Sequence, residues 1–195
     1  KYINVPYQIS YLIRNDGSIM VKSRIKLENK ELPEMLRFGM KMRLPKYENV
    51  WYYGRGPWEN YSDRNSASFI GNYKCKVNDL KFDYIRPQEN GYRTDVRFAE
   101  FTNDSGQGVR FEAVNMPFCF NARYNADEDM DPGLTKKQQH PVDVDSRGEL
   151  YVNIDYGQKG LGGDNSWGAQ PLEKDRLKDK TYEYSYVIRS VENRK

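Results

Sequence analysis

Along most of this chain, apolar and polar side chains alternate, so that every second residue is apolar within a given stretch. A period of two is typical of β-strands that have one buried face. The segment 18–27 alternates apolar and charged residues, and together with 7–14 it flanks the turn sequence Asn15-Asp16-Gly17. This arrangement predicts a two-stranded antiparallel hairpin.

The same alternation continues to the end of the chain. In 35–44 it places one set of apolar residues on a single face: Leu36, Phe38, Met40, Met42 and Leu44. In 181–191 it places Tyr182, Tyr184, Tyr186 and Ile188 on one side. Further strands are expected near 48–53, 93–101, 108–114, 117–121 and 150–156.

Helix signals are weak, since no apolar stripe with a period of 3.6 is sustained. Pro57-Trp58-Glu59-Asn60 could open a single turn, and 134–139 could form another. Clusters of turn residues separate the predicted strands, and the chain shows no internal repeat or linker. We therefore predict one all-β domain over 1–195, a large antiparallel two-sheet sandwich.

Composition excludes several classes of protein. The 31 Lys and Arg residues are interspersed with 28 Asp and Glu residues, giving a net charge of +3, and no basic stripe points to nucleic acid. No apolar run has the length needed to span a membrane. The two cysteines, Cys75 and Cys119, are expected to be packed thiols. Because the chain starts with Lys1 and shows no signal peptide, we expect a domain cut from a longer chain.

The residues that could carry chemistry give few leads. The acidic run 127–131 begins like a calcium loop, but Pro132 and Gln138 stand where such a loop needs Gly and Glu. The single histidine, His140, precedes a proline and has no triad partner in its local sequence. We predict no metal site and nominate no catalytic pair of carboxylates among the 28 acidic residues.

One loop sequence stands out, GLGGDNSW at 160–167. Glycines allow the backbone to turn sharply, the polar residues Asp164, Asn165 and Ser166 can bond hydroxyl groups, and Trp167 offers a flat ring on which a sugar can stack. The alternative is a turn that closes a hairpin, with Trp167 packed in the core. From composition alone, both readings remain open.

Three ordered stretches resemble the C-terminal domain of the multi-domain β-galactosidases of glycoside hydrolase family 2. They are LRFGMKMRLPKYENVWYYGRGPWENYSDR (36–64), IRPQENGYRTDVR (85–97) and LYVNIDYGQKGLGGDNSW (150–167), and they cover most of the chain. The resemblance implies a supersandwich similar to the galactose mutarotase fold. From their side chains, we expect Arg55, Glu59, Asp63 and Arg64 to form a network of ion pairs and hydrogen bonds that fixes loops, with direct ligand contact as the alternative.

In that family the acid/base and nucleophile glutamates lie on a (β/α)₈ barrel, and the ligands of Mg²⁺ and Na⁺ lie on other domains. The resemblance therefore implies that this chain carries no catalytic residue and no cofactor of its own. One role carries over, since Trp167 matches a tryptophan that stacks on the substrate at the mouth of the barrel, with Asp164, Asn165 and Ser166 as neighbours. Expected partners are the remaining domains of the parent enzyme, chiefly the barrel, a galactoside, and further copies in a homo-oligomer.

Two alternatives stand beside this interpretation. The chain could be a stand-alone carbohydrate-binding module, because an aromatic plate flanked by short polar side chains can bind sugar without a barrel. It could also be a mutarotase-like sugar epimerase, which would need a general acid and a general base in one cleft.

Overall fold

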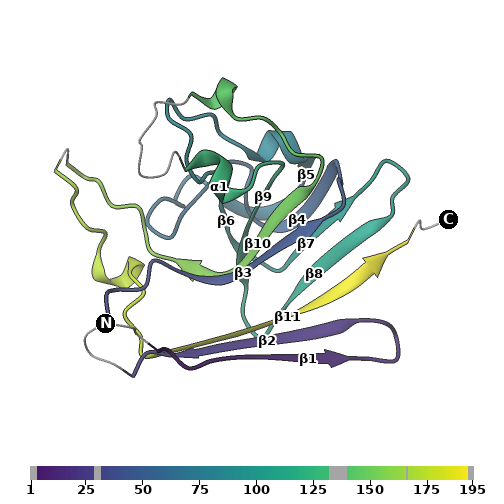
Figure 1. Ribbon diagram of the computed structural model, residues 1–195, viewed down its shortest axis with the longest axis horizontal. Coiled ribbons are helices and arrows are strands. Elements are labelled where there is room, and N and C mark those ends of the chain that lie inside the picture. Colours follow the sequence, from purple (N-terminus) through teal and green to yellow (C-terminus); the bar gives the residue numbers. More distant parts are fainter. Residues whose placement is uncertain (1–3, 29–31, 132–139, 166, 193–195) are drawn as a thin grey trace.

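The computed structural model describes residues 4–28, 32–131, 140–165 and 167–192, and these residues form mostly β-strands (Figure 1). The strands are β1 (Tyr7–Ile13), β2 (Ile19–Lys26), β3 (Arg37–Leu44), β4 (Asn49–Gly56), β5 (Phe69–Lys76), β6 (Arg93–Val96), β7 (Phe98–Thr102), β8 (Gly108–Val114), β9 (Phe118–Arg123), β10 (Leu150–Gln158) and β11 (Thr181–Val191). The helical elements are short: α1 (Asp127–Met130) and the 3-10 turns Val77–Leu80, Pro141–Asp143 and Glu173–Asp175.

The strands form two antiparallel sheets of unequal width. The larger sheet has seven strands in the order β1-β2-β11-β8-β7-β4-β5, and the smaller has four in the order β3-β10-β9-β6. Figure 1 shows the segment between β10 and β11 projecting from the sandwich on the side away from the C-terminus. The predicted fold class, an antiparallel two-sheet sandwich, is confirmed.

Aromatic side chains fill the space between the sheets. Phe120 of the smaller sheet meets Phe101 of the larger one edge to face, with ring centroids 5.9 Å apart. Phe38 of β3 packs in the same way on Tyr184 of β11, at 5.5 Å. This geometry is favourable for aromatic pairs because the positive edge of one ring faces the negative face of the other. The alternating tyrosines of β11 are therefore core residues, as their pattern predicts.

The other face of the smaller sheet is polar and yet buried. Asp155 of β10 is 1% exposed and pairs with Arg37 on β3. Its Oδ2 accepts a hydrogen bond from Arg37 Nε at 2.7 Å and lies 2.6 Å from Arg37 Nη2. Next to them, Asn153 Nδ2 donates to Asn121 Oδ1 at 2.6 Å. Because buried polar groups are costly unless paired, this face requires the loops above it to supply partners.

Most of the expected strands are found, with informative differences. The strand β5 is missed by sequence reasoning because Gly71 and two lysines dilute its apolar pattern, as is common in edge strands. The predicted strand 93–101 is two strands in different sheets, β6 and β7. Between them the backbone of Arg97 bonds both Tyr53 and Ala113, where the chain crosses from one sheet to the other.

Two smaller predictions are wrong and one lies outside the described residues. Residues 57–60 do not form a helical turn, because the side chain of Asn60 instead donates to the carbonyls of Arg55 (3.2 Å) and Trp58 (3.0 Å). Leu36 precedes β3 and is 68% exposed rather than part of its core face. The possible turn at 134–139 lies in the part of the chain that the structure does not describe.

A glycine makes the buried ion pair possible. Gly39 of β3 lies opposite Asp155, and a Cβ atom there would collide with the carboxylate and with the Asp155 backbone. We expect Gly39→Ala to lower the free energy of unfolding by about 1–3 kcal/mol, the usual effect of overpacking a filled site. Urea unfolding of the purified chain measures this.

The matched control is Gly157→Ala on the neighbouring strand, since no atom lies within 4 Å of a Cβ built there. Its effect should stay within about 0.5 kcal/mol, as for surface substitutions in general. Equal effects of the two substitutions would contradict the proposed role of Gly39.

Candidate functional site

Three sequence motifs far apart along the chain meet at one end of the sandwich. They are GRGPWENYSDR (54–64), PQENG (87–91) and GLGGDNSW (160–167). The first two are joined through Glu59, whose Oε2 accepts from the backbone N–H of Gly91 at 2.8 Å and whose Oε1 accepts from the Tyr84 hydroxyl. Burial raises the pKa of Tyr84 to about 12, so its hydroxyl stays protonated and able to donate.

The first motif also holds the third. Asp63 accepts hydrogen bonds from the backbone N–H groups of Leu161, at 3.1 Å to Oδ1, and Gly162, at 2.7 Å to Oδ2. Arg64 Nη2 donates to the carbonyl oxygen of Gly162 at 2.6 Å. Two side chains that are neighbours in the sequence thus bond the N–H and the C=O of Gly162.

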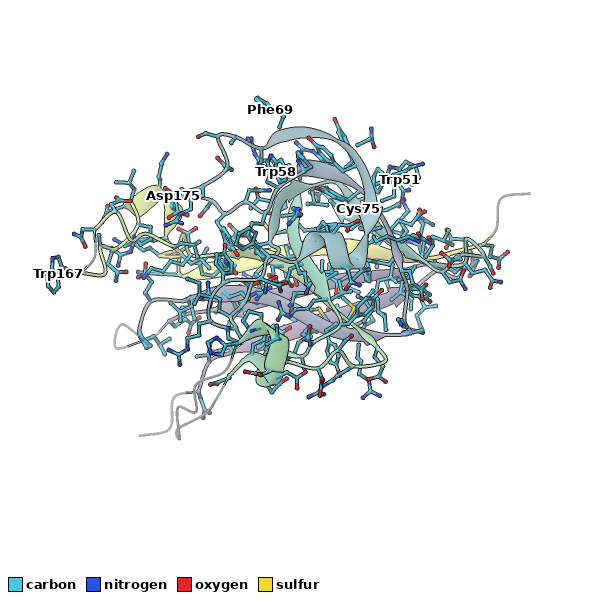
Figure 2. All side chains as sticks on the ribbon, turned by 90° about the horizontal axis from the view of Figure 1, so that it is seen from above. Trp51, Trp58, Phe69, Cys75, Trp167 and Asp175 are labelled. Atoms are coloured by element: carbon cyan, nitrogen blue, oxygen red, sulfur yellow. The ribbon has the colours of Figure 1, made fainter. Side chains whose placement is uncertain are left out.

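Trp167 lies at the tip of the loop that is held in this way. Its side chain is 92% exposed, and Figure 2 shows it projecting away from the sandwich. Below it, the backbone N–H of Gly163 donates to Ala169 O at 2.9 Å and closes the neck of the loop. The alternative reading of Trp167 as a core residue is therefore wrong.

The other predicted site residues of this loop behave differently from one another. Asn165 Oδ1 accepts from the backbone N–H groups of Trp167 (2.9 Å) and Ala169 (3.3 Å), so its side chain shapes the loop. Asp164 is exposed beside it. Ser166 lies outside the described residues.

The predicted loop-fixing network is present, but its four members bond other groups rather than one another. Arg55 donates to Asp95 Oδ2 at 2.5 Å and to Ser68 O at 2.9 Å. Glu59 bonds Gly91, while Asp63 and Arg64 both bond the segment 161–162. The motif 54–64, which begins in β4, therefore connects that strand to the segments 87–91 and 160–163.

A further anchor, which sequence reasoning missed, holds the base of the projecting segment. Glu34 accepts from Arg176 Nε at 2.5 Å and from Arg176 Nη2 at 2.8 Å, and Lys159 Nζ lies 3.1 Å from its Oε2. Hydrogen bonding from Arg176 lowers the pKa of Glu34 to about 2. Nothing in the local sequence signals this contact, because the partners are 142 residues apart.

A groove runs beside the same loop. It has a volume of about 640 Å³ and is lined by Arg37, Glu89, Gln158, Leu161, Gly163 and Pro171, among others. Glu89 Oε1 accepts a hydrogen bond from Asn121 Nδ2 at 2.5 Å and lies 3.5 Å from Arg37 Nη1. Burial raises the pKa of Glu89, while Arg37 and Arg123 oppose the shift.

Asp155 and Glu89 do not form an open acid/base pair. Burial raises the pKa of Asp155 to about 6, although Arg37 opposes the rise. Asp155 is 1% exposed, and both Nε and Nη2 of Arg37 contact its Oδ2. A substrate atom therefore cannot reach the Asp155 carboxyl group. The geometry required for mutarotation is thus lacking at this pair.

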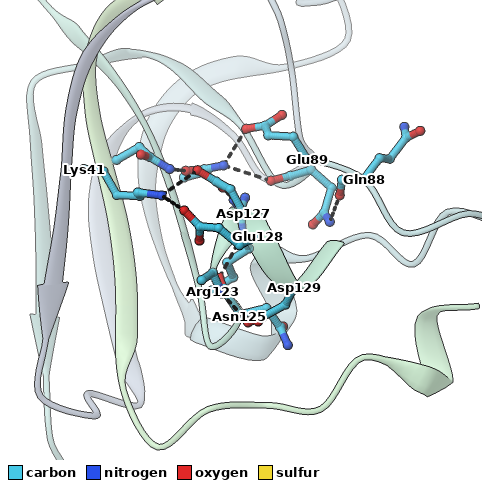
Figure 3. A network of polar contacts seen from close by, with 12 residues as sticks. Lys41, Gln88, Glu89, Arg123, Asn125, Asp127, Glu128 and Asp129 are labelled. Atoms are coloured by element: carbon cyan, nitrogen blue, oxygen red, sulfur yellow. Dashed lines mark hydrogen bonds and ion pairs between the residues drawn. The ribbon is translucent and has the colours of Figure 1, made fainter. Parts of the chain in front are cut away.

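The acidic run 127–131 begins with the short helix α1 and is largely paired (Figure 3). Lys41 Nζ lies 3.1 Å from both Asp127 Oδ2 and Glu128 Oε1, while Arg123 pairs with Asp127. Asp129 pairs with Arg147 and accepts from the Ala126 N–H at 2.8 Å. Across the described ranges, no group of three or more His, Cys, Asp or Glu side chains is arranged to hold a metal ion.

The remaining candidate residues have ordinary surroundings. Both thiols are free and partly buried, as expected, and burial raises the pKa of Cys75 to about 11 and of Cys119 to about 12. His140 is exposed at the start of a 3-10 turn. Among the helices of the described part of the chain, none is both long and apolar enough to cross a membrane.

The geometry is that of a two-sheet sandwich with one aromatic side chain presented on a braced loop. The model of the family described as β-galactosidase small chain matches residues 2–188. The β-galactosidase of Halalkalibacterium halodurans is 33% identical over 192 residues, which are 96% of this chain and 18% of the relative. That of Lactococcus lactis subsp. lactis is 32% identical over 89% of this chain and 16% of the relative.

The chain therefore belongs to the β-galactosidase small chain family, as its motifs indicate. It spans 15–18% of the length of the β-galactosidases from Halalkalibacterium halodurans, Priestia megaterium and Lactococcus lactis subsp. lactis.

The Glu34 anchor predicts a pH dependence. The carboxylate has a folded pKa of about 2 against an ordinary 4.5, so its stabilising contribution is complete above pH 4.5 and is lost as the pH falls toward 2. The urea midpoint of Glu34→Gln should lie below that of the unmodified chain at pH 6, and the gap should shrink at pH 3.

Glu28→Gln is the control, since that side chain is 71% exposed and its nearest ion-pair contact, to Lys26 Nζ, is long at 3.8 Å. Exposed pairs of this kind contribute little, so its midpoint should match the unmodified chain at each pH. A Glu34→Gln gap that is constant from pH 6 to pH 3 would contradict the assignment.

Proposed function

We propose that this chain is the C-terminal sandwich domain of a larger β-galactosidase, in which Trp167 forms an aromatic wall of the sugar site. The observation that carries the proposal is the placement of Trp167, which is 92% exposed at the tip of a loop braced from two sides. Family membership and the five- to six-fold greater length of the relatives support the same conclusion.

Stacking supplies the chemistry of this wall. A galactoside presents an apolar C–H face to which a flat indole is complementary, and covering both removes apolar surface from water. Trp167 is available because its ring lies outside the sandwich. Its role is to bind and orient the sugar and to exclude water, whereas bond cleavage requires other groups.

The parent enzyme would hydrolyse terminal β-D-galactosyl residues with retention of configuration. One carboxyl group protonates the glycosidic oxygen while a second attacks the anomeric carbon, and water then releases the sugar. We place both carboxyl groups, and the ligands of Mg²⁺ and Na⁺, on other domains of the parent. The chain by itself should then be inactive, with the catalytic barrel as its chief partner and further copies in a homo-oligomer.

A stand-alone carbohydrate-binding module is the second candidate. The groove of about 640 Å³ beside the Trp167 loop favours it, because a ring and a neighbouring polar groove can hold a sugar without a second domain. The two candidates differ in whether the isolated chain binds galactosides.

In the full-length parent, Trp167→Ala should raise KM for lactose, because the stacking surface is lost. The expected loss of substrate binding is about 1–3 kcal/mol, the scale for burying an aromatic side chain. Steady-state kinetics measure it, with Trp51→Phe on β4 as the control substitution. An unchanged KM, together with unchanged inhibition by lactose, would contradict the role of Trp167.

For the isolated chain we expect no saturable change in tryptophan fluorescence on titration with lactose or galactose, because only part of the site is present. The chain has three tryptophans, so the titration is repeated on Trp167→Phe to assign any signal. Saturable quenching that disappears in this variant would favour the binding module instead.

A further inference from the structure

The loop that carries Trp167 is held by bonds to its backbone rather than by packing of its own side chains. Leu161 is 46% exposed and Trp167 is 92% exposed, so neither anchors the loop in the core. Glu34 holds the base of the projecting segment, and nearer the tip Asp63 and Arg64 bond Leu161 and Gly162. The position of the indole therefore depends on these two side chains.

Asp63 is suited to this task because a carboxylate has two oxygens that can accept at once. Each oxygen takes one of two successive backbone N–H groups, at 3.1 and 2.7 Å. Bonds to a charged acceptor are shorter and stronger than neutral ones. Arg64 adds the opposite polarity by donating to Gly162 O at 2.6 Å, so the peptide units cannot rotate without breaking a bond to one of the two.

Both side chains are themselves fixed. The backbone N–H of Arg64 donates to Tyr61 O at 2.9 Å, and the N–H of Tyr61 donates to Arg64 O at 3.3 Å, which closes a tight turn around Asp63. Tyr61 is 3% exposed and its ring stacks on that of Tyr92 at 5.6 Å. The turn is therefore attached to the buried part of the domain.

The glycines of the loop complete the arrangement. A Cβ at Gly160 would lie 2.7 Å from the carboxylate carbon of Asp63, so only glycine leaves room for this side chain. We call the bonds of Asp63 and Arg64 to Leu161 and Gly162 the clamp. Gly162 has φ +64°, a left-handed conformation that favours glycine, and a Cβ there would strike the carbonyl of Ala169. The glycines before Trp167 thus admit Asp63 from one side and form the neck on the other.

We propose that Asp63 and Arg64 are positioning residues that set the place of Trp167 in the sugar site without touching the sugar. This inference rests on the proposed function, because it assumes that Trp167 stacks on the substrate. Asn165 acts within the loop, where it shapes the tip, whereas Asp63 and Arg64 fix the whole loop to the domain.

The test is a double-mutant cycle in the full-length parent enzyme. Asp63→Ala should raise KM for lactose about three- to tenfold, the range for losing a typical hydrogen bond, and Asp63→Asn should have a smaller effect because one acceptor oxygen remains. In a Trp167→Ala background, Asp63→Ala should raise KM no further. An equal rise in both backgrounds would overturn the proposal.

Hydrogen exchange supplies a readout that does not depend on sugar. The N–H groups of Leu161 and Gly162 should exchange faster in Asp63→Ala than in the unmodified enzyme, while those of the core strand β11 should not change. Asp104→Ala is the matched control, since that carboxylate is exposed and pairs with Lys76 on the larger sheet. Gly162→Ala leaves Asp63 intact and should reproduce the KM effect by distorting the neck.

The outcomes separate the two proposals. If Trp167→Ala leaves KM unchanged but Asp63→Ala still loses protection at Leu161 and Gly162, the sugar-binding role fails and the clamp stands. If Trp167→Ala raises KM while Asp63→Ala changes neither KM nor exchange, the clamp is wrong and the sugar-binding role stands.

Discussion

The buried pairing of Arg37 with Asp155 is the constraint on which the end of the sandwich that carries Trp167 depends. It places a charged group on the outer face of the smaller sheet, where an ordinary sandwich would expose short polar side chains to water. Because a buried charge is tolerated only when it is paired and hydrogen-bonded, the loops above must close over it. Glu89 of the motif 87–91 does so, through its contacts with Arg37 and Asn121.

From this pair, contacts lead outward to the loop of Trp167. The motif 87–91 is bonded by Glu59, and the loop that contains Glu59 also contains Asp63, which holds Leu161 and Gly162. Each step joins a side chain to backbone groups, which fixes the path of a loop as well as its distance from the sheet. Glu34 closes the other side of the projecting segment through Arg176 and Lys159. The sandwich thus supports a loop that makes few hydrophobic contacts of its own.

The sequence predicts the sandwich well because alternation of apolar and polar residues follows directly from the geometry of a strand. It misses β5, whose glycine and lysines weaken that pattern, and it joins β6 to β7, because a crossing between sheets leaves no signature in the spacing of apolar residues. For the site, the motif residues Asp63 and Arg64 could be named in advance as loop-fixing groups. Their partner could not, since a bond to a backbone N–H of Gly162 depends on the fold and not on the type of either residue.

This construction fits the role proposed for Trp167 in a site made by several domains. An indole that must meet a sugar held by another domain gains from being fixed beforehand, because ordering a mobile loop on binding would offset part of the stacking energy. Packing the ring into the sandwich would fix it as well, but it would also cover the surface that the proposed stacking needs. Hydrogen bonds to the loop backbone resolve this conflict, since they restrain the chain at Leu161 and Gly162 and leave Trp167 uncovered. The glycine-rich sequence therefore makes the loop more rigid, because the missing side chain of Gly160 lets the Asp63 carboxylate come close enough to hold the loop.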